Sequence, residues 1–412
     1  MIKRMCRVLL PLFGSVSLAA GLLAATLASA GPAAAGLFSQ STTLYVSATA
    51  PSQPWQQGNG PQRPGHGRGQ HAYGCDNPQY STISAAVAAA QPGSTIDVCP
   101  GTYSEDVVVG EPLTIIGTDA VVNPGSATNS PFATLLGNNA FTVVAPNVTI
   151  QGFTVQDASG DGILVAGDQA NINHITALDN GGTGVDLNGS SWSTVSNVVA
   201  EGNTGGGVYL TNDYGALSRG ATASHDMVID NVLDNNPGGC GVILADHLGT
   251  TVLGAQGIFD NTIVGNQVDN NGNDPAGIGA GIILASPVPG GAVYNNKILH
   301  NTIDGSGLAG ITLHSHLLGQ GDFSGNVLIG NDIGTNNLGG LASEAGGDDG
   351  DASTSGIYLG SVDPLSVTIW GNVIHNDQDG IFTAGPVSVN GTFFNHYFGV
   401  ADPFVSTPTY AG

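Results

Sequence analysis

Basic side chains are nearly missing from this sequence of 412 residues. Lysine and arginine together number seven against 31 aspartates and glutamates, a formal net charge of −24 at pH 7. Lys3, Arg4 and Arg7 lie among the first 36 residues, so the remaining chain has four basic and 31 acidic side chains, a net charge of −27. Such a surface repels polyanions, which excludes nucleic acid and an anionic membrane as partners.

Cysteine is scarce, and long apolar runs are confined to the start. Four cysteines are too few for a zinc site. Residues 1–36 join a basic start to an apolar run and small-residue cleavage sites, which is typical of a signal peptide. The alternative for this run is an uncleaved anchor, and no later stretch could span a bilayer. We therefore expect a secreted protein, extracellular or periplasmic, with no membrane contact after cleavage.

Glycine is abundant, with 64 residues, and much of it belongs to a repeat over residues 147–383. An apolar strand leads into a polar turn, and a Gly-aliphatic-x-apolar element follows. The turn positions are Gly152, His174, Asn197, Asn231, Asn266, Asn301, Asn331 and Asn372. The second element begins at Gly162, Gly184, Gly207, Gly241, Gly281, Gly310, Gly356 and Gly380. These glycines are 22, 23, 34, 40, 29, 46 and 24 residues apart, which indicates a coil of about 22 residues lengthened by loops.

Strands this short are stable only when stacked. Alternating aliphatics such as Val195, Val198, Val208 and Leu210 would form one inward row, buried between successive coils. Gly and Asn at the corners tolerate a positive φ, and Asn side chains at equivalent corners can hydrogen-bond from coil to coil. A disordered Gly/Asn-rich chain is the alternative, and the 41% hydrophobic content argues against it.

The asparagine ladder and the 22-residue period resemble the pectate-lyase-like superfamily over roughly residues 44–394. The resemblance implies an all-β fold, a single-stranded right-handed parallel β-helix or solenoid. It implies no one activity, because this scaffold carries lyases, hydrolases, esterases, epimerases, adhesins and non-enzymes. The motifs of pectin methylesterases and the Asp-Pro-His-Glu of mannuronan epimerases are absent. Pectate lyases use Arg or Lys as base, and the repeat offers only Arg219 and Lys297.

We predict one β-helix domain over residues 37–412, with a flexible insertion at 48–73. Residues 81–90 predict a short capping helix with Ser81 or Thr82 as N-cap, within an N-terminal cap and first coils at 74–117. Cys75 and Cys99 bracket this cap and predict a disulfide, worth about 3 kcal/mol for a loop of this length. Cys240 is expected to be a buried small residue. Residues 384–412 are aromatic and predict a C-terminal cap over the last coil.

Loops that follow the Gly-aliphatic-x-Leu strand should stack on one wall and form a groove. They predict a catalytic set of carboxylates and imidazoles at Asp213, Asp246, His247, His314 and His316. Tyr214, Arg219, His225 and Asp226 are the predicted substrate-binding residues. Ordinary turn chemistry is the alternative, since Asp and Asn favour corners.

A second candidate is an acidic loop containing Glu344, Asp348, Asp349 and Asp351, which could bind Ca²⁺ or could simply be solvated. No other cofactor is indicated. The composition favours a monomer that acts on a polysaccharide, either neutral or acidic with Ca²⁺ bridging. The hypotheses are a polysaccharide hydrolase or lyase, and a non-catalytic glycan-binding or envelope scaffold. The long middle loops favour the first, and a periplasmic metal-delivery role rests on scattered His only.

Overall fold

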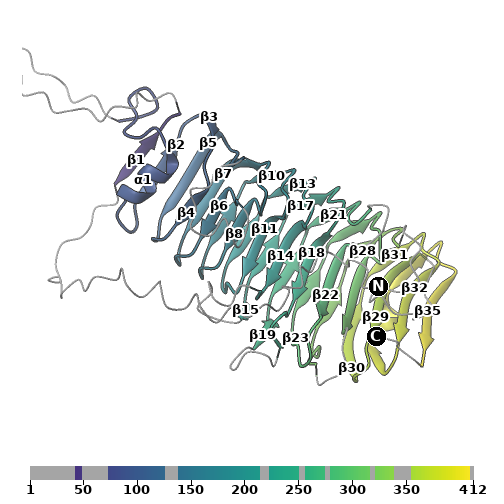
Figure 1. The fold of residues 1–412 in the computed structure, drawn as a ribbon. Coiled ribbons are helices and arrows are strands. Elements are labelled where there is room, and N and C mark those ends of the chain that lie inside the picture. The colour runs from purple at the N-terminus through teal and green to yellow at the C-terminus, as the bar shows by residue number, and fades with distance from the viewer. Residues whose placement is uncertain are drawn as a thin grey trace, which may run out of the picture.

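The computed structural model describes residues 42–48, 73–125, 138–213, 222–249, 256–273, 279–315, 321–337 and 354–408. They form one elongated stack of β-coils that begins at a short helix and ends at strand β35 (Figure 1). The predicted signal peptide and nearly all of the predicted insertion lie outside these residues. Within the described part of the chain, no helix combines the length and hydrophobicity needed to cross a membrane.

The described strands form a 21-stranded, an 11-stranded and a 3-stranded sheet, and all their strand pairs are parallel. The largest sheet consists of two columns that share the long strands β5 and β7. From β2 onward each coil therefore takes part in three columns, with β5 and β7 each serving two of them, and three coils add a strand to a fourth. This arrangement confirms the predicted parallel β-helix.

The first column contains β1 (Thr43–Val46), β2 (Thr95–Val98), β5 (Thr114–Val122), β7 (Thr149–Gln156), β9 (Asn171–Asn173), β12 (Thr194–Ser196), β16 (Met227–Ile229), β20 (Thr262–Val264), β24 (Lys297–Leu299), β27 (Val327–Ile329), β30 (Leu365–Trp370) and β33 (Val387–Asn390). The second contains, besides β5 and β7, β3 (Gly101–Tyr103), β10 (Thr176–Leu178), β13 (Val199–Glu201), β17 (Val232–Asp234), β21 (Gln267–Asp269), β25 (Thr302–Asp304), β28 (Asp332–Ile333), β31 (Val373–His375) and β34 (His396–Phe398).

The third column is the 11-stranded sheet, formed by β4 (Val107–Val109), β6 (Phe141–Val143), β8 (Ile163–Val165), β11 (Thr183–Asn188), β14 (Gly206–Thr211), β18 (Cys240–Ala245), β22 (Ile282–Ser286), β26 (Ile311–Ser315), β29 (Ser355–Gly360), β32 (Asp379–Ala384) and β35 (Asp402–Thr407). The fourth column is the 3-stranded sheet, formed by β15 (Thr222–Ser224), β19 (Gly257–Phe259) and β23 (Val293–Tyr294).

The core is built from aliphatic side chains that stack in register. Val195 pairs with Val228, which pairs with Ile263, and the same column continues through Ile298 and Leu328. All five are fully buried. Because successive strand residues point to opposite faces, alternate aliphatics fall inside, as predicted. Cys240 is also buried, and its Sγ accepts a hydrogen bond from the Ala280 N–H at 3.2 Å.

Buried asparagines run along the stack in ladders. Asn266 shows the bonding: its Oδ1 accepts the N–H and the Nδ2 of Asn231 at 3.0 and 2.8 Å. Its own N–H and Nδ2 donate to Asn301 at 3.0 and 2.9 Å, and Nδ2 also reaches the Val228 carbonyl at 3.0 Å. The ladder between the first two columns consists of Asn231, Asn266, Asn301, Asn331, Asn372 and Asn395.

The first three predicted turn positions belong to a different place in the corner. Gly152, His174 and Asn197 have a positive φ, as Asp230 does, and Asp230 immediately precedes the ladder residue Asn231. The N–H of Val198, not of Asn197, donates to the Oδ1 of Asn231 at 2.9 Å. The corner therefore contains a left-handed residue and then the ladder residue, and the predicted list mixes the two.

The glycines of the Gly-aliphatic element are needed for space, not for a positive φ. Gly207 is not among the residues with positive φ. A Cβ on it would lie 2.5 Å from the carbonyl oxygen of Gly241 and 3.1 Å from Leu233. Glycine's tolerance of a positive φ, the predicted reason, applies instead at Gly265, which has a φ of +68° in the left-handed corner position.

The N-terminal end is covered by helix α1 (Ile83–Ala89). Thr82 is its N-cap, and its side chain accepts the Ala85 N–H at 3.2 Å. The Glu105 carboxylate accepts the N–H groups of Ile83 and Ser84 at 2.8 and 2.9 Å, which satisfies two further helix donors. The predicted Cys75–Cys99 disulfide is present in the structure, with the two Cα atoms 5.6 Å apart.

The C-terminal segment differs from the predicted aromatic cap. Its described residues include the 3-10 helix η3 (Thr392–Phe394) and the strands β33, β34 and β35, and these three strands pair in parallel with the preceding coil. Phe394, Phe398 and Phe404 are exposed. The segment adds one more coil because Val387, Val389 and Tyr397 continue the inward rows, a pattern the missing Gly-aliphatic element concealed.

Candidate functional site

Two buried carboxylates lie on the outer side of the 11-stranded sheet. Val185 and Leu187 of β11 belong to the core, so Asp186 between them faces the other way. Asp186 accepts Nδ2 of Asn188 at 3.1 Å and the hydroxyl of Thr211 at 3.3 Å.

Asp161, which precedes β8, accepts the N–H and the hydroxyl of Thr183 at 2.7 and 2.9 Å. Both carboxylates are almost fully buried. The outer face of this sheet thus holds two buried acidic groups.

Burial changes the acidity of this pair. Loss of water raises the pKa of Asp161, and its bonds to Thr183 lower it only in part. The pKa of Asp186 is raised well above its ordinary value, first by burial and then by the negative charge of Asp161. The same two charges, after burial, raise the pKa of Tyr209, which is in register with Asp186. A carboxyl group in this setting holds its proton at higher pH and can donate it.

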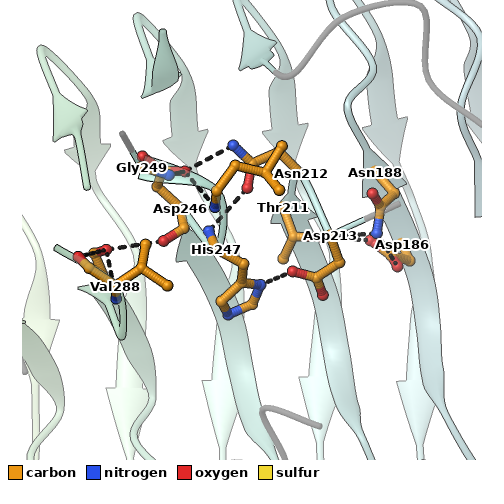
Figure 2. Close-up of polar contacts among 11 residues, drawn as sticks. Asp186, Asn188, Thr211, Asn212, Asp213, Asp246, His247, Gly249 and Val288 are labelled. Carbon is orange, nitrogen blue, oxygen red and sulfur yellow. Dashed lines mark hydrogen bonds and ion pairs between the residues drawn. The ribbon is translucent and has the colours of Figure 1, made fainter. Parts of the chain in front are cut away.

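An aspartate–histidine pair lies at the corner that follows the same sheet. Asp213 follows β14 and His247 follows β18, on adjacent coils, and Asp213 Oδ1 contacts His247 Nδ1. The His247 N–H is held by Asn212 Oδ1 at 2.8 Å. Figure 2 shows His247, Asp213 and Asp186 side by side on three neighbouring coils. An imidazole oriented by a carboxylate is the usual arrangement of a general base.

Asp246 is used to hold the corner together. Its Oδ1 accepts Nδ2 of Asn212 at 2.8 Å and the N–H groups of Leu248 and Gly249, both at 3.0 Å. Its Oδ2 accepts the N–H of Ala292, from the next coil, at 2.8 Å. Four donors on one buried carboxylate fix the loop conformation, so Asp246 supports His247 in position.

His314 lies on the same sheet, two coils beyond β18. It is in register with Ala285 and, through it, with Ala245, the residue before Asp246. The side chain is fully buried. The structure therefore brings Asp213 and His247 into contact, places Asp246 beside them, and sets His314 further along the same face.

His225 and Asp226 are at a different corner, between the fourth and first columns. Asp226 occupies an asparagine-ladder position: its Oδ1 accepts the Ser193 N–H at 2.7 Å, and its N–H donates to Asn261 Oδ1 at 2.9 Å. It is buried, which raises its pKa well above the ordinary value. His225 precedes it, partly exposed, with Nε2 3.7 Å from Asp260 Oδ2. Tyr214, Arg219, His316 and the acidic set Glu344, Asp348, Asp349 and Asp351 lie outside the described residues.

Metal binding finds no support among the residues that the structure describes, where no group of three or more His, Cys, Asp or Glu side chains could hold an ion. The predicted Ca²⁺ loop falls outside them and stays a prediction.

Sequence reasoning missed Asp161 and Asp186. A signal for Asp186 was available: the x position of its Gly-Val-Asp-Leu element is charged, whereas the strands paired beside it have Leu164 and Tyr209 there.

Comparison with known proteins agrees with the coil architecture. The model of the family described as "Right handed beta helix region" matches residues 139–385. The chain therefore belongs to the right-handed β-helix family. No curated protein matches it in sequence.

Several solved structures are similar to this chain. The A-module of mannuronan C-5 epimerase AlgE6 from Azotobacter vinelandii is 18% identical with a TM-score of 0.51, covering 80% of this chain and 94% of that one. The adhesin PfbA of Streptococcus pneumoniae is 13% identical with a TM-score of 0.48, covering 78% and 87%. Pectate lyase Pel9A is 16% identical with a TM-score of 0.41, covering 91% and 82%. At 18% identity, the likeness to the AlgE6 module is one of fold alone.

Proposed function

We propose that this chain is a secreted, carbohydrate-active β-helix protein that hydrolyses a polysaccharide along the outer edge of its 11-stranded sheet. The observation that carries the proposal is the combination of a proton-holding carboxyl group, Asp186, with the Asp213–His247 pair on the two following coils. Asp186 would protonate the leaving glycosidic oxygen, and His247, oriented by Asp213, would activate water.

The charge around the site favours a neutral polysaccharide. Lys297 is the one Lys or Arg among the described residues, and it lies on β24, in the first column, away from this edge. A uronate lyase needs a group that offsets the substrate carboxylate, so an acidic polysaccharide would require a bridging cation such as Ca²⁺. The Cys75–Cys99 disulfide suits an oxidising, extracellular compartment. We keep the predicted monomer as part of the proposal.

The test is a panel of neutral and acidic polysaccharides incubated with the full chain, with and without Ca²⁺. We expect new reducing ends from a neutral polysaccharide, without unsaturated uronate absorbance. Asp186→Asn and His247→Ala should each lower the rate by about 100-fold or more, the usual contribution of a general acid or base. Asp304→Asn, an exposed carboxylate on β25, is the matched control and should leave the rate unchanged.

A rate that survives both substitutions would exclude this site. Unsaturated products that appear only with Ca²⁺ would identify a lyase instead.

A second candidate is a glycan-binding protein that cleaves nothing. One observation favours it: the carboxylates of Asp226 and Asp246, two predicted site residues, accept hydrogen bonds from the protein's own backbone N–H groups. Binding of a polysaccharide without any new reducing end, and with no effect of Asp186→Asn, would select this alternative.

A further inference from the structure

Asparagine is followed directly by glycine at four places among the described residues, namely Asn180, Asn188, Asn271 and Asn390. In such a pair the backbone nitrogen of the glycine lies within reach of the asparagine side-chain carbonyl carbon, and glycine has no side chain to shield that nitrogen. Attack of the nitrogen on this carbon needs an N–H that can lose its proton and an amide that can turn towards it. The fold meets these two conditions very differently at the four places.

Three of the four pairs are held closed by the coils around them. Asn180, Asn188 and Asn271 are fully buried, and their side-chain amides are hydrogen-bonded. The glycine after each asparagine donates its N–H to a carbonyl oxygen of a neighbouring coil: Gly181 to Ala158 at 2.8 Å, Gly189 to Thr211 at 2.7 Å and Gly272 to Asn236 at 2.9 Å. Attack at any of these three places requires buried hydrogen bonds to break first.

The fourth pair, Asn390 and Gly391, lies on the last coil that the structure describes, at the yellow end of the stack (Figure 1). Asn390 ends β33 and is exposed. Its Nδ2 donates to the exposed hydroxyl of Ser366 at 3.3 Å. A hydrogen bond in this position exchanges with water at little cost, so the amide can turn.

The Gly391 N–H faces away from the preceding coil. Successive residues of a strand in a parallel sheet direct their N–H groups to opposite neighbours. Thr368, the register partner of Asn390, donates its N–H to Asn326 on the coil before it. Asn390 shares that direction, so Gly391 has the opposite one, towards the side where no further coil is described. Accordingly, no backbone hydrogen bond between described residues has the Gly391 N–H as its donor.

We propose that Asn390 is a site of spontaneous deamidation, which the open end of the stack leaves unprotected. The Gly391 nitrogen gives its proton to hydroxide and attacks Cγ of Asn390. The new N–Cγ bond closes a succinimide ring, the Cγ–Nδ2 bond breaks, and the amide leaves as ammonia after taking a proton from water. Water then opens the ring at either carbonyl and yields aspartate or isoaspartate. No atom changes its oxidation state, and solvent water is the co-reactant.

Deamidation changes the end of the stack. Either product adds a negative charge at position 390, and isoaspartate also lengthens the backbone just before η3, whose N-cap is Gly391. The last described strand of the first column can accept this change, because β33 pairs with β30 and no described strand of that column follows it. The site goes beyond the proposed function, since none of the proposed catalytic residues takes part.

The experiment incubates the folded full chain in mildly alkaline buffer made with water labelled with heavy oxygen. Digestion in ordinary water follows, so that only modification during the incubation carries the label. Mass spectrometry of the four Asn-Gly peptides should show label at Asn390, as both isoaspartate and aspartate. Asn180, Asn188 and Asn271 should react at least about tenfold more slowly, because attack there requires a local opening that breaks buried hydrogen bonds.

Two controls separate the fold from the dipeptide. In concentrated urea the four sites should react at similar rates, because the unfolded chain protects none of them. Asn390→Gln should remove the label from this peptide in the folded chain, since the longer side chain closes a larger and less favourable ring.

A folded chain that labels Asn390 no faster than the three buried asparagines would overturn the proposal. So would the same order of rates in urea, which would trace the difference to neighbouring residues in the sequence. The result is independent of the proposed hydrolysis. If no polysaccharide is cleaved while Asn390 is labelled, the hydrolysis fails and the modification site stands, and cleavage with an unlabelled Asn390 gives the reverse.

Discussion

The asparagine ladders and the outer edge of the 11-stranded sheet use similar polar residues for opposite purposes. In a ladder each amide both donates and accepts, so a stack of identical residues satisfies itself, as Asn266 does with Asn231 and Asn301. At the sheet edge the residues are carboxylates and an imidazole, which cannot pair with copies of themselves. Asp186 instead depends on Asn188 and Thr211, and Asp213 on His247. Neutral, self-complementary groups build the ladders, whereas Asp186, Asp213 and His247 lie outside them.

The largest effect that this comparison predicts is a loss of folding stability when an asparagine in the middle of a ladder is replaced. Asn266→Ala removes the acceptor of Asn231 and the donors to Asn301 and Val228, all buried. We expect the free energy of unfolding to fall by about 3 kcal/mol or more, because each stranded group costs about 1–3 kcal/mol. Chemical denaturation measures it. Asn171→Ala, at an exposed position of β9, is the control and should cost less than about 1 kcal/mol.

The next prediction concerns the aspartate that replaces an asparagine in a ladder. Asp226 Oδ2 is buried and has no hydrogen-bond partner among the described residues. Asp226→Asn supplies an amide that can donate to Asn261, so we expect a gain of about 1–2 kcal/mol at pH 7. The melting temperature is the readout. A loss of stability would mean that the carboxylate is required at this position.

Stability should also depend on pH in a defined direction. Burial raises the folded-state pKa of Asp161, Asp186 and Asp226 above 3.8, so the folded chain binds protons more tightly than the unfolded one. The free energy of unfolding is therefore greatest in mild acid. It falls as the pH rises from about the ordinary aspartate pKa through the raised pKa values of these three groups. Thermal unfolding between pH 4 and 8 tests this. Asp226→Asn should flatten the slope, and an unchanged slope would contradict the assignment.

The smallest effect belongs to a stripe of like charges in the second column. Asp234, Asp269 and Asp304 are in direct register on adjacent coils. The pKa of Asp269 is raised by burial, and the neighbouring carboxylates add to the increase. Asp269→Asn should stabilise the chain by about 0.5 kcal/mol in low salt, and the gain should shrink at high salt. A gain independent of salt would point to a cause other than repulsion.

Much of the fold followed from local pattern. The Gly-aliphatic spacing, an N-cap at Ser81 or Thr82 and the Cys75–Cys99 pair were predicted from the sequence and are present in the structure, where Thr82 is the cap. The candidate site was predictable only in part. The contact between Asp213 and His247 follows from stacking of equivalent loops, but Asp246 is bound by Ala292, 46 residues further along the chain. Coil lengths from 22 to 46 residues leave such partners undefined in the sequence.

By itself the sequence determined that the chain winds into stacked coils and which aliphatics turn inward, because a strand's two faces alternate and the repeat carries that phase from coil to coil. Only the tertiary structure decided what each polar corner residue does. Asp226 and Asp213 look alike in sequence, yet one accepts a backbone N–H inside a ladder and the other faces an imidazole. The difference arises because the neighbouring coil presents different groups beside the two residues.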